Sequence, residues 1–482
     1  MKGQNNFIKS GIVYTILGFL PTASRFVLFP LFLHYLSPED FALISLNTMV
    51  ASILPTFITL GLDTSINRFY FDFVKYPKIE KAFVSTLIIS ISCTALVIGA
   101  IFTGIGPKLF LISFKTQRFS FFPFGISALL TAIPTGLYSL YLNYLRCRKD
   151  LQNYVILNLG LFIFSSLGEV IGIIFLKMPV EHLIWIKPLV LWPFVIVATI
   201  SILWKTGIHF ERRLLRIAMS YSTPLLPHLI FGMVFIYTDR IMIENNLNLT
   251  YLAIYNLTMA ISNIIDIFEQ ALRNATFPNI YKLLKQDVSA NVDAISRIHS
   301  MNGLLLLSIM AVVAIMVPIG DYYFLKPVYR PLIYLIPFAL NISVIRFFYI
   351  VYAEPLFFFK KVKHVSTSTF LQGIFSILFN FLLIPRFGLM GAIIANIISK
   401  CIQVIFIYYT SISIKIFSYR VGFILTCMFI MMVILLGLTF SSRFLMDSRQ
   451  IVHILASIPL IFVSFAFIYF VRKNNISIKQ LW

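Results

Sequence analysis

The chain has 482 residues, of which 59% are hydrophobic and only 12% are charged, and its formal net charge is +21. Soluble domains carry about 25% charged residues, so this composition excludes a soluble globular protein and predicts an all-α polytopic membrane protein. The four cysteines are scattered along the chain, which argues against a disulfide framework and against a metal site.

Apolar runs of about 20 residues, the length that crosses a bilayer as a helix, predict about 14 transmembrane helices. In chain order we expect spans at 10–36, 40–61, 83–105, 121–145, 152–177, 182–204, 222–245, 250–272, 299–319, 331–354, 366–386, 389–411, 420–440 and 450–471. The first apolar run is too long for a cleavable signal peptide, so we expect this span to act as an uncleaved signal.

Two segments between the spans are amphipathic. Residues 209–227, HFERRLLRIAMSYSTPLLP, predict an interfacial helix that leads into the seventh span. Residues 273–298 are basic and are expected to lie along the membrane surface. The first segment also separates two groups of six spans. The sequence therefore predicts an N-terminal lobe at 1–206, a C-terminal lobe at 207–412, and two further helices with a tail at 413–482.

The distribution of the basic residues predicts the orientation. Of the 39 lysines and arginines, twenty-five fall on the side of the N-terminus, nine on the other side and five within spans. The positive-inside rule then places both termini in the cytoplasm. The charge of +21 is explained by this topology and by attraction to anionic lipid headgroups, so we expect no nucleic-acid partner.

Two arginines lie inside predicted spans, Arg25 in the first and Arg240 in the seventh. A charge at the centre of a bilayer costs at least ~2.5 kcal/mol, so such residues usually face a cavity or an anionic partner. The alternative is that each arginine pairs with a carboxylate of the protein and holds helices together. Asp239 adjoins Arg240, although neighbours in a helix point about 100° apart and need not pair.

The first and seventh spans show a faint repeat. LSPEDFALISL at 36–46 follows the first span, and LNLTYLAIYNL at 247–257 follows the seventh. Six spans separate the two copies, so the halves would run in the same direction. This predicts a parallel repeat about an axis along the membrane normal, which is a transporter architecture.

Several motifs carry a resemblance to a known family. They are SRFVLFPLFLHYLSPEDFALISL, GLDTSINRFYFD, YLRCRKDLQNY, STPLLPHLI, TDRIMI and LFNFLLIPRFGLMGAIIANIIS, in that order over about 400 residues. The chain resembles the polysaccharide-exporter branch of the multidrug/oligosaccharidyl-lipid/polysaccharide (MOP) superfamily, and most closely the Wzx-type O-antigen flippases. The resemblance implies two six-helix lobes around a central cavity, with two extra C-terminal helices outside, in a bacterial inner membrane.

The resemblance also implies a substrate, an undecaprenyl-diphosphate-linked oligosaccharide that moves from the cytoplasmic to the periplasmic leaflet. The family pattern places functional cations at Arg25, Arg68 and Arg240. Arginine suits a diphosphate because its planar fork donates two parallel hydrogen bonds and remains charged when it is desolvated. Other glycan-assembly proteins and membrane lipids are the expected partners.

Further charged residues within or near spans are candidates for the site. Lys400 and Arg346 could contribute to the substrate cavity, although Lys400 could also extend to the interface. Asp239, Glu169 and Asp266 could couple transport to a H⁺ or Na⁺ gradient, because a buried carboxylate can bind a cation. For Asp239 a salt bridge or a helix cap is an equally good interpretation. We expect no other cofactor.

The sequence contains no HExxH, CxxC, Walker A or GxSxG motif. It therefore predicts a transporter rather than an enzyme, without direct use of ATP. A lipid II-type flippase or a cation-coupled antiporter of the same superfamily is the nearest alternative. A membrane glycan polymerase or ligase is an alternative from another class. Such an enzyme normally needs a large outer loop, whereas the longest outer segments expected here are 104–120 and 320–330.

Overall fold

The computed structural model describes residues 28–29, 31–285, 288–323, 325–359, 361–413, 422–444 and 455–474. Each secondary-structure element within these ranges is a helix or a short helical turn. Ten helical stretches of the described residues are long and apolar enough to cross a membrane. The prediction of an all-α polytopic membrane protein is therefore confirmed. Most of the first expected span, 10–36, lies outside the described residues.

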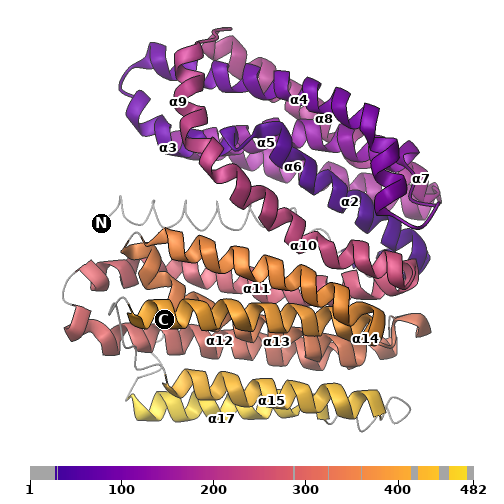
Figure 1. Ribbon diagram of the computed structural model, residues 1–482, viewed down its shortest axis with the longest axis vertical. Helices are drawn as coiled ribbons and strands as arrows, with labels where there is room; N and C mark the ends of the chain where they lie inside the picture. Colours follow the sequence, from indigo (N-terminus) through magenta and orange to yellow (C-terminus); the bar gives the residue numbers. More distant parts are fainter. Residues whose placement is uncertain are drawn as a thin grey trace. The chain divides into compact units, whose positions relative to one another are not determined.

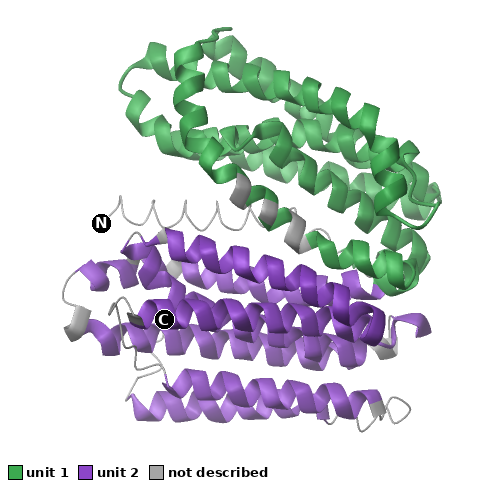
Figure 2. Cartoon of the chain, in the orientation of Figure 1, with its two compact units in different colours: residues 1–253 green, residues 254–482 purple. Residues whose placement is uncertain are grey.

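Contacts between residues divide the chain into two compact units, Met1–Ala253 and Ile254–Trp482 (Figure 2). The sequence placed its lobe boundary earlier, between 206 and 207. The difference arises because α10 (Leu226–Asn246) packs against α2 (Pro38–Thr59) within the first unit. The assignment of the sequence to lobes stays a prediction.

The first unit is built around one central helix, α5 (Ile126–Arg148), which packs against α2, α3, α4, α6 and α8. Small residues at helical spacing on α5, namely Ala128, Ala132 and Gly136, allow this close packing. A Cβ atom at Gly136 would lie 3.0 Å from the Thr59 side chain. The other elements of the unit are α3 (Leu62–Phe73), α4 (Pro77–Ser113), η1 (Phe121–Gly125), α6 (Leu151–Val170), η2 (Ile171–Phe175), α7 (Val180–Leu183), α8 (Ile186–Thr206), α9 (Arg212–Ser222) and η3 (Thr223–Leu225) (Figure 1).

Helix α9 has the amphipathic character that the sequence predicted. Leu214 and Ala218 are buried, and the helix packs against α3 and α4. Arg212, Arg213 and Arg216 are exposed on its other side. A short turn then leads directly into α10, as expected for the entry into the seventh span.

The second unit is also built around one helix, α13 (Leu332–Phe358), which packs against α12, α14 and α15. Helix α5 corresponds to the fourth predicted span and α13 to the tenth. The same relative position in both units is what a parallel repeat of six spans would give. The other elements of this unit are α11 (Leu249–Lys285, whose first turn belongs to the first unit), α12 (Val288–Tyr323), η4 (Pro327–Tyr329), α14 (Val362–Ser413), α15 (Gly422–Phe444) and α17 (Ile458–Lys473) (Figure 1).

Helix α14 contains a reversal that separates two predicted spans. Gly388 has φ 57° and ψ −135°, a conformation that favours glycine because it has no side chain. Gly391 then lies against the preceding segment, where an added Cβ would be 2.2 Å from the carbonyl oxygen of Leu383. An uninterrupted helix would separate residues eight apart by about 12 Å. The chain therefore folds back at PRFGLMG, between the spans expected at 366–386 and 389–411.

The segment 273–298 differs from the expectation. It is not a separate surface segment, because α11 continues to Lys285 and α12 begins at Val288. Ile280, Leu284 and Ile295 are buried and form a small apolar core against Phe358 of α13. This packing keeps the ends of both helices together, so the apolar side of the segment covers protein instead of a lipid surface.

Candidate functional site

The candidate residues comprise an acid–base pair on α10, two separate positions on α3 and α6 of the first unit, and a charged cluster in the second unit. Arg25 lies outside the described residues, so its environment stays a prediction.

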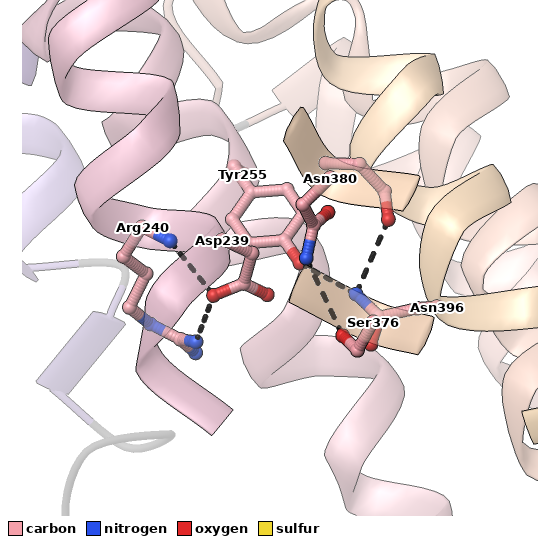
Figure 3. A network of polar contacts seen from close by, with 7 residues as sticks. Asp239, Arg240, Tyr255, Ser376, Asn380 and Asn396 are labelled. Atoms are coloured by element: carbon pink, nitrogen blue, oxygen red, sulfur yellow. Dashed lines mark hydrogen bonds and ion pairs between the residues drawn. The ribbon is translucent and has the colours of Figure 1, made fainter. Parts of the chain in front are cut away.

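Asp239 and Arg240 interact with each other on α10 (Figure 3). One carboxylate oxygen of Asp239 accepts the backbone N–H of Arg240 at 2.7 Å and its Nη1 at 3.1 Å. The guanidinium also lies 5.3 Å from the centre of the Tyr237 ring. Asp239 is buried, and the side chain of Arg240 is 16% exposed. The long arginine side chain thus folds back onto its neighbour, although the two Cα–Cβ bonds diverge.

Arg68 and Glu169 occupy peripheral positions in the first unit. Arg68 on α3 donates to Asp72 at 3.0 Å, and both side chains are more than half exposed. Its guanidinium lies 5.3 Å from the centre of the Phe69 ring. Glu169 is half-buried on α6. The roles predicted for Arg68 and Glu169 remain predictions.

Three candidates from separate helices meet in the second unit. Arg346 of α13 donates to Asp266 of α11 and forms a 3.1 Å ion pair between its Nε and Glu269. Lys400 of α14 interacts electrostatically with all three of these side chains. Glu269 is the most buried carboxylate of the group, with 6% of its side chain exposed. Arg346 therefore joins two carboxylates of its own protein, which fits the alternative in which a buried arginine holds helices together.

Sequence reasoning missed Glu269 and Arg273, although their spacing carried a signal. Asp266, Glu269 and Arg273 are separated by three and four residues, which places them on one face of α11. Arg273 interacts electrostatically with Glu269 and lies 5.3 Å from the centre of the Phe277 ring. One helical face thus carries two acids and a base toward α13.

A small cavity lies beside this cluster, toward the C-terminal ends of α11 and α13. It measures about 20 Å³, and its polar lining consists of Glu269, Arg273, Thr276, His299, Asn302 and Glu354. Asn302 donates to Thr276 at 3.1 Å. His299 of α12 and Glu354 of α13 face each other at 3.4 Å, and both are almost completely buried. Sequence reasoning missed His299 and Glu354, because each is a single polar residue in an apolar run.

Helices α11 and α14 also carry polar side chains that contact one another (Figure 3). Asn396 donates to the hydroxyl of Tyr255 at 3.1 Å, which joins α14 to α11. Asn380 donates to Ser376 at 3.4 Å within α14, before the reversal at Gly388. The described residues include no group of three or more His, Cys, Asp or Glu side chains that could hold a metal ion.

Comparisons with known proteins agree with this architecture. A family model described as polysaccharide biosynthesis protein matches residues 34–319, which is more than half of the chain. Comparison with curated proteins finds no match.

Three solved structures show the same fold. The lipid II flippase MurJ in an inward closed conformation has a TM-score of 0.70 at 13% identity, with 96% of this chain and 100% of that chain covered. An inward-facing multidrug resistance MATE family transporter of the MOP superfamily has a TM-score of 0.60 at 13% identity, with 84% and 99% covered. The Vibrio cholerae MATE transporter VcmN in the bent form has a TM-score of 0.55 at 13% identity, with 87% and 100% covered. The chain therefore belongs to the polysaccharide biosynthesis protein family, and its fold is similar to that of the lipid II flippase MurJ and of the MATE transporters.

Proposed function

We propose that this protein is a flippase for an undecaprenyl-diphosphate-linked oligosaccharide, such as an O-antigen repeat unit. It would move this lipid from the cytoplasmic to the periplasmic leaflet of the inner membrane by alternating access. One observation carries the proposal. A polysaccharide biosynthesis family model covers residues 34–319 of a chain that aligns over 96% of its length with the fold of a lipid II flippase.

The proposed role of the first-unit arginines is to bind the diphosphate. Arg240 lies in the span expected at 222–245 and its side chain is only 16% exposed, which strengthens its attraction for a phosphate oxygen. Its bond to Asp239 means that the substrate must compete with a carboxylate for the guanidinium. During the transport cycle, Arg240 would exchange Asp239 for the diphosphate. The bond between Arg240 and Asp239 would then break when the substrate binds. Arg25 is proposed as the second phosphate ligand.

Coupling to an ion gradient is part of the same proposal. A buried carboxylate inside a membrane protein loses compensating positive charge when its arginine neighbour turns to a substrate, which favours the binding of a proton or sodium ion. We infer that Asp239 binds such a cation when Arg240 turns to the diphosphate. Asp239→Asn should remove any dependence of transport on a gradient in liposomes, whereas an unchanged dependence would exclude this role.

The transporter fold argues against a glycan polymerase or ligase. Such an enzyme would need a substantial outer domain, but the two segments expected to be longest on that side are largely helical. Helix α4 extends to Ser113, and α12 extends to Tyr323. The alternative within the superfamily, a lipid II-type flippase or a cation-coupled antiporter, is favoured by the similarity to the lipid II flippase and to the MATE transporters.

Complementation of strains that each lack one flippase tests the proposal. Rescue of surface glycan in a strain without its O-antigen flippase supports it, and rescue only in a strain depleted of its lipid II flippase supports the alternative. Arg25→Ala and, to a lesser degree, Arg240→Ala should abolish glycan display while the protein stays in the membrane. Arg25→Lys should rescue only in part, because lysine lacks the bidentate fork.

A matched control is available on the surface of the first unit. Arg118→Ala removes a half-exposed arginine whose Nη2 lies 2.7 Å from Asp40, and this variant should retain glycan display. Normal display by the Arg25 and Arg240 variants would refute the phosphate-binding role of these arginines.

A further inference from the structure

The second unit contains a buried acid–histidine pair, Glu354 and His299, which forms no ion pair with Arg346 of the charged cluster among the described residues. Arg346 binds Asp266 and Glu269, whereas the ion-pair contact of Glu354 among the described residues is with His299, at 3.4 Å. An imidazole is charged only when it carries a second proton. Glu354 is 1% exposed, and its two carboxylate oxygens accept no hydrogen bond from the described residues.

A buried carboxylate without hydrogen bonds is unfavourable while it is ionised. One proton on the carboxylate removes this problem, because the carboxyl group and the neutral imidazole that faces it at 3.4 Å are then both uncharged. The pair has a formal charge of −1 without that proton and zero with it. His299 belongs to α12 and Glu354 to α13. The protonation state of the pair therefore changes the attraction between these two helices.

The cavity supplies a place for the proton to be exchanged. A space of about 20 Å³ is sufficient for one water molecule, provided that polar groups surround it. Glu354 lines this cavity together with Glu269, whose Oε1 is buried and also accepts no hydrogen bond from the described residues. A single water there could therefore connect two carboxylates, one in the ion cluster and one in the acid–histidine pair.

The surroundings favour a proton over a metal ion. The described residues offer no group of three or more His, Cys, Asp or Glu ligands, and the cavity is also lined by a guanidinium. Tyr281, beyond the membrane-spanning part of α11, has its pKa raised, first by burial and then by the charge of Glu354. The titratable and charged groups that surround Glu354 and its cavity are Asp266, Glu269, Arg273 and Tyr281 on α11, His299 on α12, Arg346 on α13 and Lys400 on α14.

We propose that Glu354 and His299 form a proton-binding site that couples a proton gradient to transport, with Glu269 and the cavity as its route of exchange. The coupling to transport rests on the proposed function and deepens it. The binding of a proton by Glu354 and His299 does not depend on that function. The apolar core of Ile280, Leu284, Ile295 and Phe358 adjoins the cavity, because Ile280 also lines it, and this core includes the C-terminal residue of α13. Access from that side would thus depend on the packing of α11 against α12.

Infrared difference spectroscopy of the purified full-length protein tests the site directly. As the pH is changed, the wild type should show the carbonyl stretch of a buried protonated carboxyl group, and Glu354→Gln should lose it. Glu244→Gln is the matched control, because Glu244 is equally buried but accepts the amides of Lys115 and Thr116 at 3.0 and 2.7 Å. A band that persists in Glu354→Gln, or that sodium abolishes in the wild type at constant pH, would overturn the proposal.

His299→Gln keeps the test decisive if Glu354→Gln does not fold. Loss of the imidazole should shift the pH at which the carboxyl band appears, and an unshifted band would contradict a shared proton. Proteoliposomes with a lipid-linked oligosaccharide and an imposed pH gradient add the functional readout. A pH gradient should accelerate flipping by the wild type and should not accelerate flipping by Glu354→Gln. If the wild type moves no such lipid, the proposed function fails, whereas the spectroscopic result still decides the proton site.

Discussion

Replacement of Arg346 by methionine distinguishes a residue that holds helices together from one that binds substrate. The change keeps most of the side-chain volume but removes the base that contacts Asp266 and Glu269. Loss of one partner from a buried ion pair costs about 3–5 kcal/mol, because the other charge remains buried and uncompensated. Glu269 falls in this class, since only 6% of its side chain is exposed.

The charges around Arg346 place the expected loss of stability within this range of free energies. Asp266 is 27% exposed, so water can reach it, and its lost contact should add at most about 1 kcal/mol. Lys400 and Arg273 remain near Glu269 and offset part of the penalty. We therefore expect Arg346→Met to destabilise the protein by about 3 kcal/mol, the lower end of the range for buried pairs.

The double variant Arg346→Met/Glu269→Gln removes the stranded charge as well. It should be more stable than Arg346→Met alone, with a coupling energy of about 0.5–3 kcal/mol. Arg68→Met is the matched control, because its i,i+4 pair with Asp72 is more than half exposed and should contribute only about 0.3–0.5 kcal/mol. Denaturant titration of the purified protein in detergent, followed by fluorescence, measures all three differences.

Two outcomes would contradict a structural role for Arg346. If Arg346→Met is as stable as Arg68→Met but no longer supports glycan display, Arg346 acts on the substrate and its contacts with the two carboxylates are not structural. If both stability and display are unchanged, the ion cluster has neither role.

Two further predictions concern the framework around the candidate site. Gly391→Ala should prevent the close return of α14 at its reversal, because the new Cβ would lie 2.2 Å from the Leu383 carbonyl oxygen. Size-exclusion chromatography should show loss of the monodisperse protein, whereas Gly437→Ala, which has no heavy atom within 4 Å of the added Cβ, should behave as the wild type. Glu244→Ala should leave two backbone N–H groups of the segment 115–116 without their acceptor, at a cost of about 1–3 kcal/mol for each that water cannot reach. Hydrogen exchange at Lys115 and Thr116 should then accelerate, and unchanged exchange at these two amides would show that the contact contributes nothing.

Elements that depend on a local pattern of residues could be predicted from the amino-acid sequence. A bilayer requires long apolar helices, so hydropathy alone placed most of the long apolar helices, with errors of more than ten residues at one end of α11 and one end of α12. It gave no prediction for the short helix α3. The basic amphipathic face of α9 and the break at PRFGLMG were also readable, because side-chain chemistry and glycine content are local properties. The continuation of α11 to Lys285 and the start of α12 at Val288 could not be predicted. The apolar face of this segment could have covered lipid or protein equally well.

The contacts between polar residues of different helices could not be predicted in this way, because they depend on how the folded chain packs. Asp266, Arg346 and Lys400 looked like separate candidates in three spans, and packing of α11, α13 and α14 brought them into one cluster. The Glu354–His299 pair required that α12 and α13 turn two particular faces toward each other. Hydropathy reports that a residue lies in a helix but not the direction in which the helix faces, because a nearly uniformly apolar span carries little periodic signal. The rotation of each helix, and with it the partner of each buried charge, is therefore fixed by side-chain packing among distant parts of the chain.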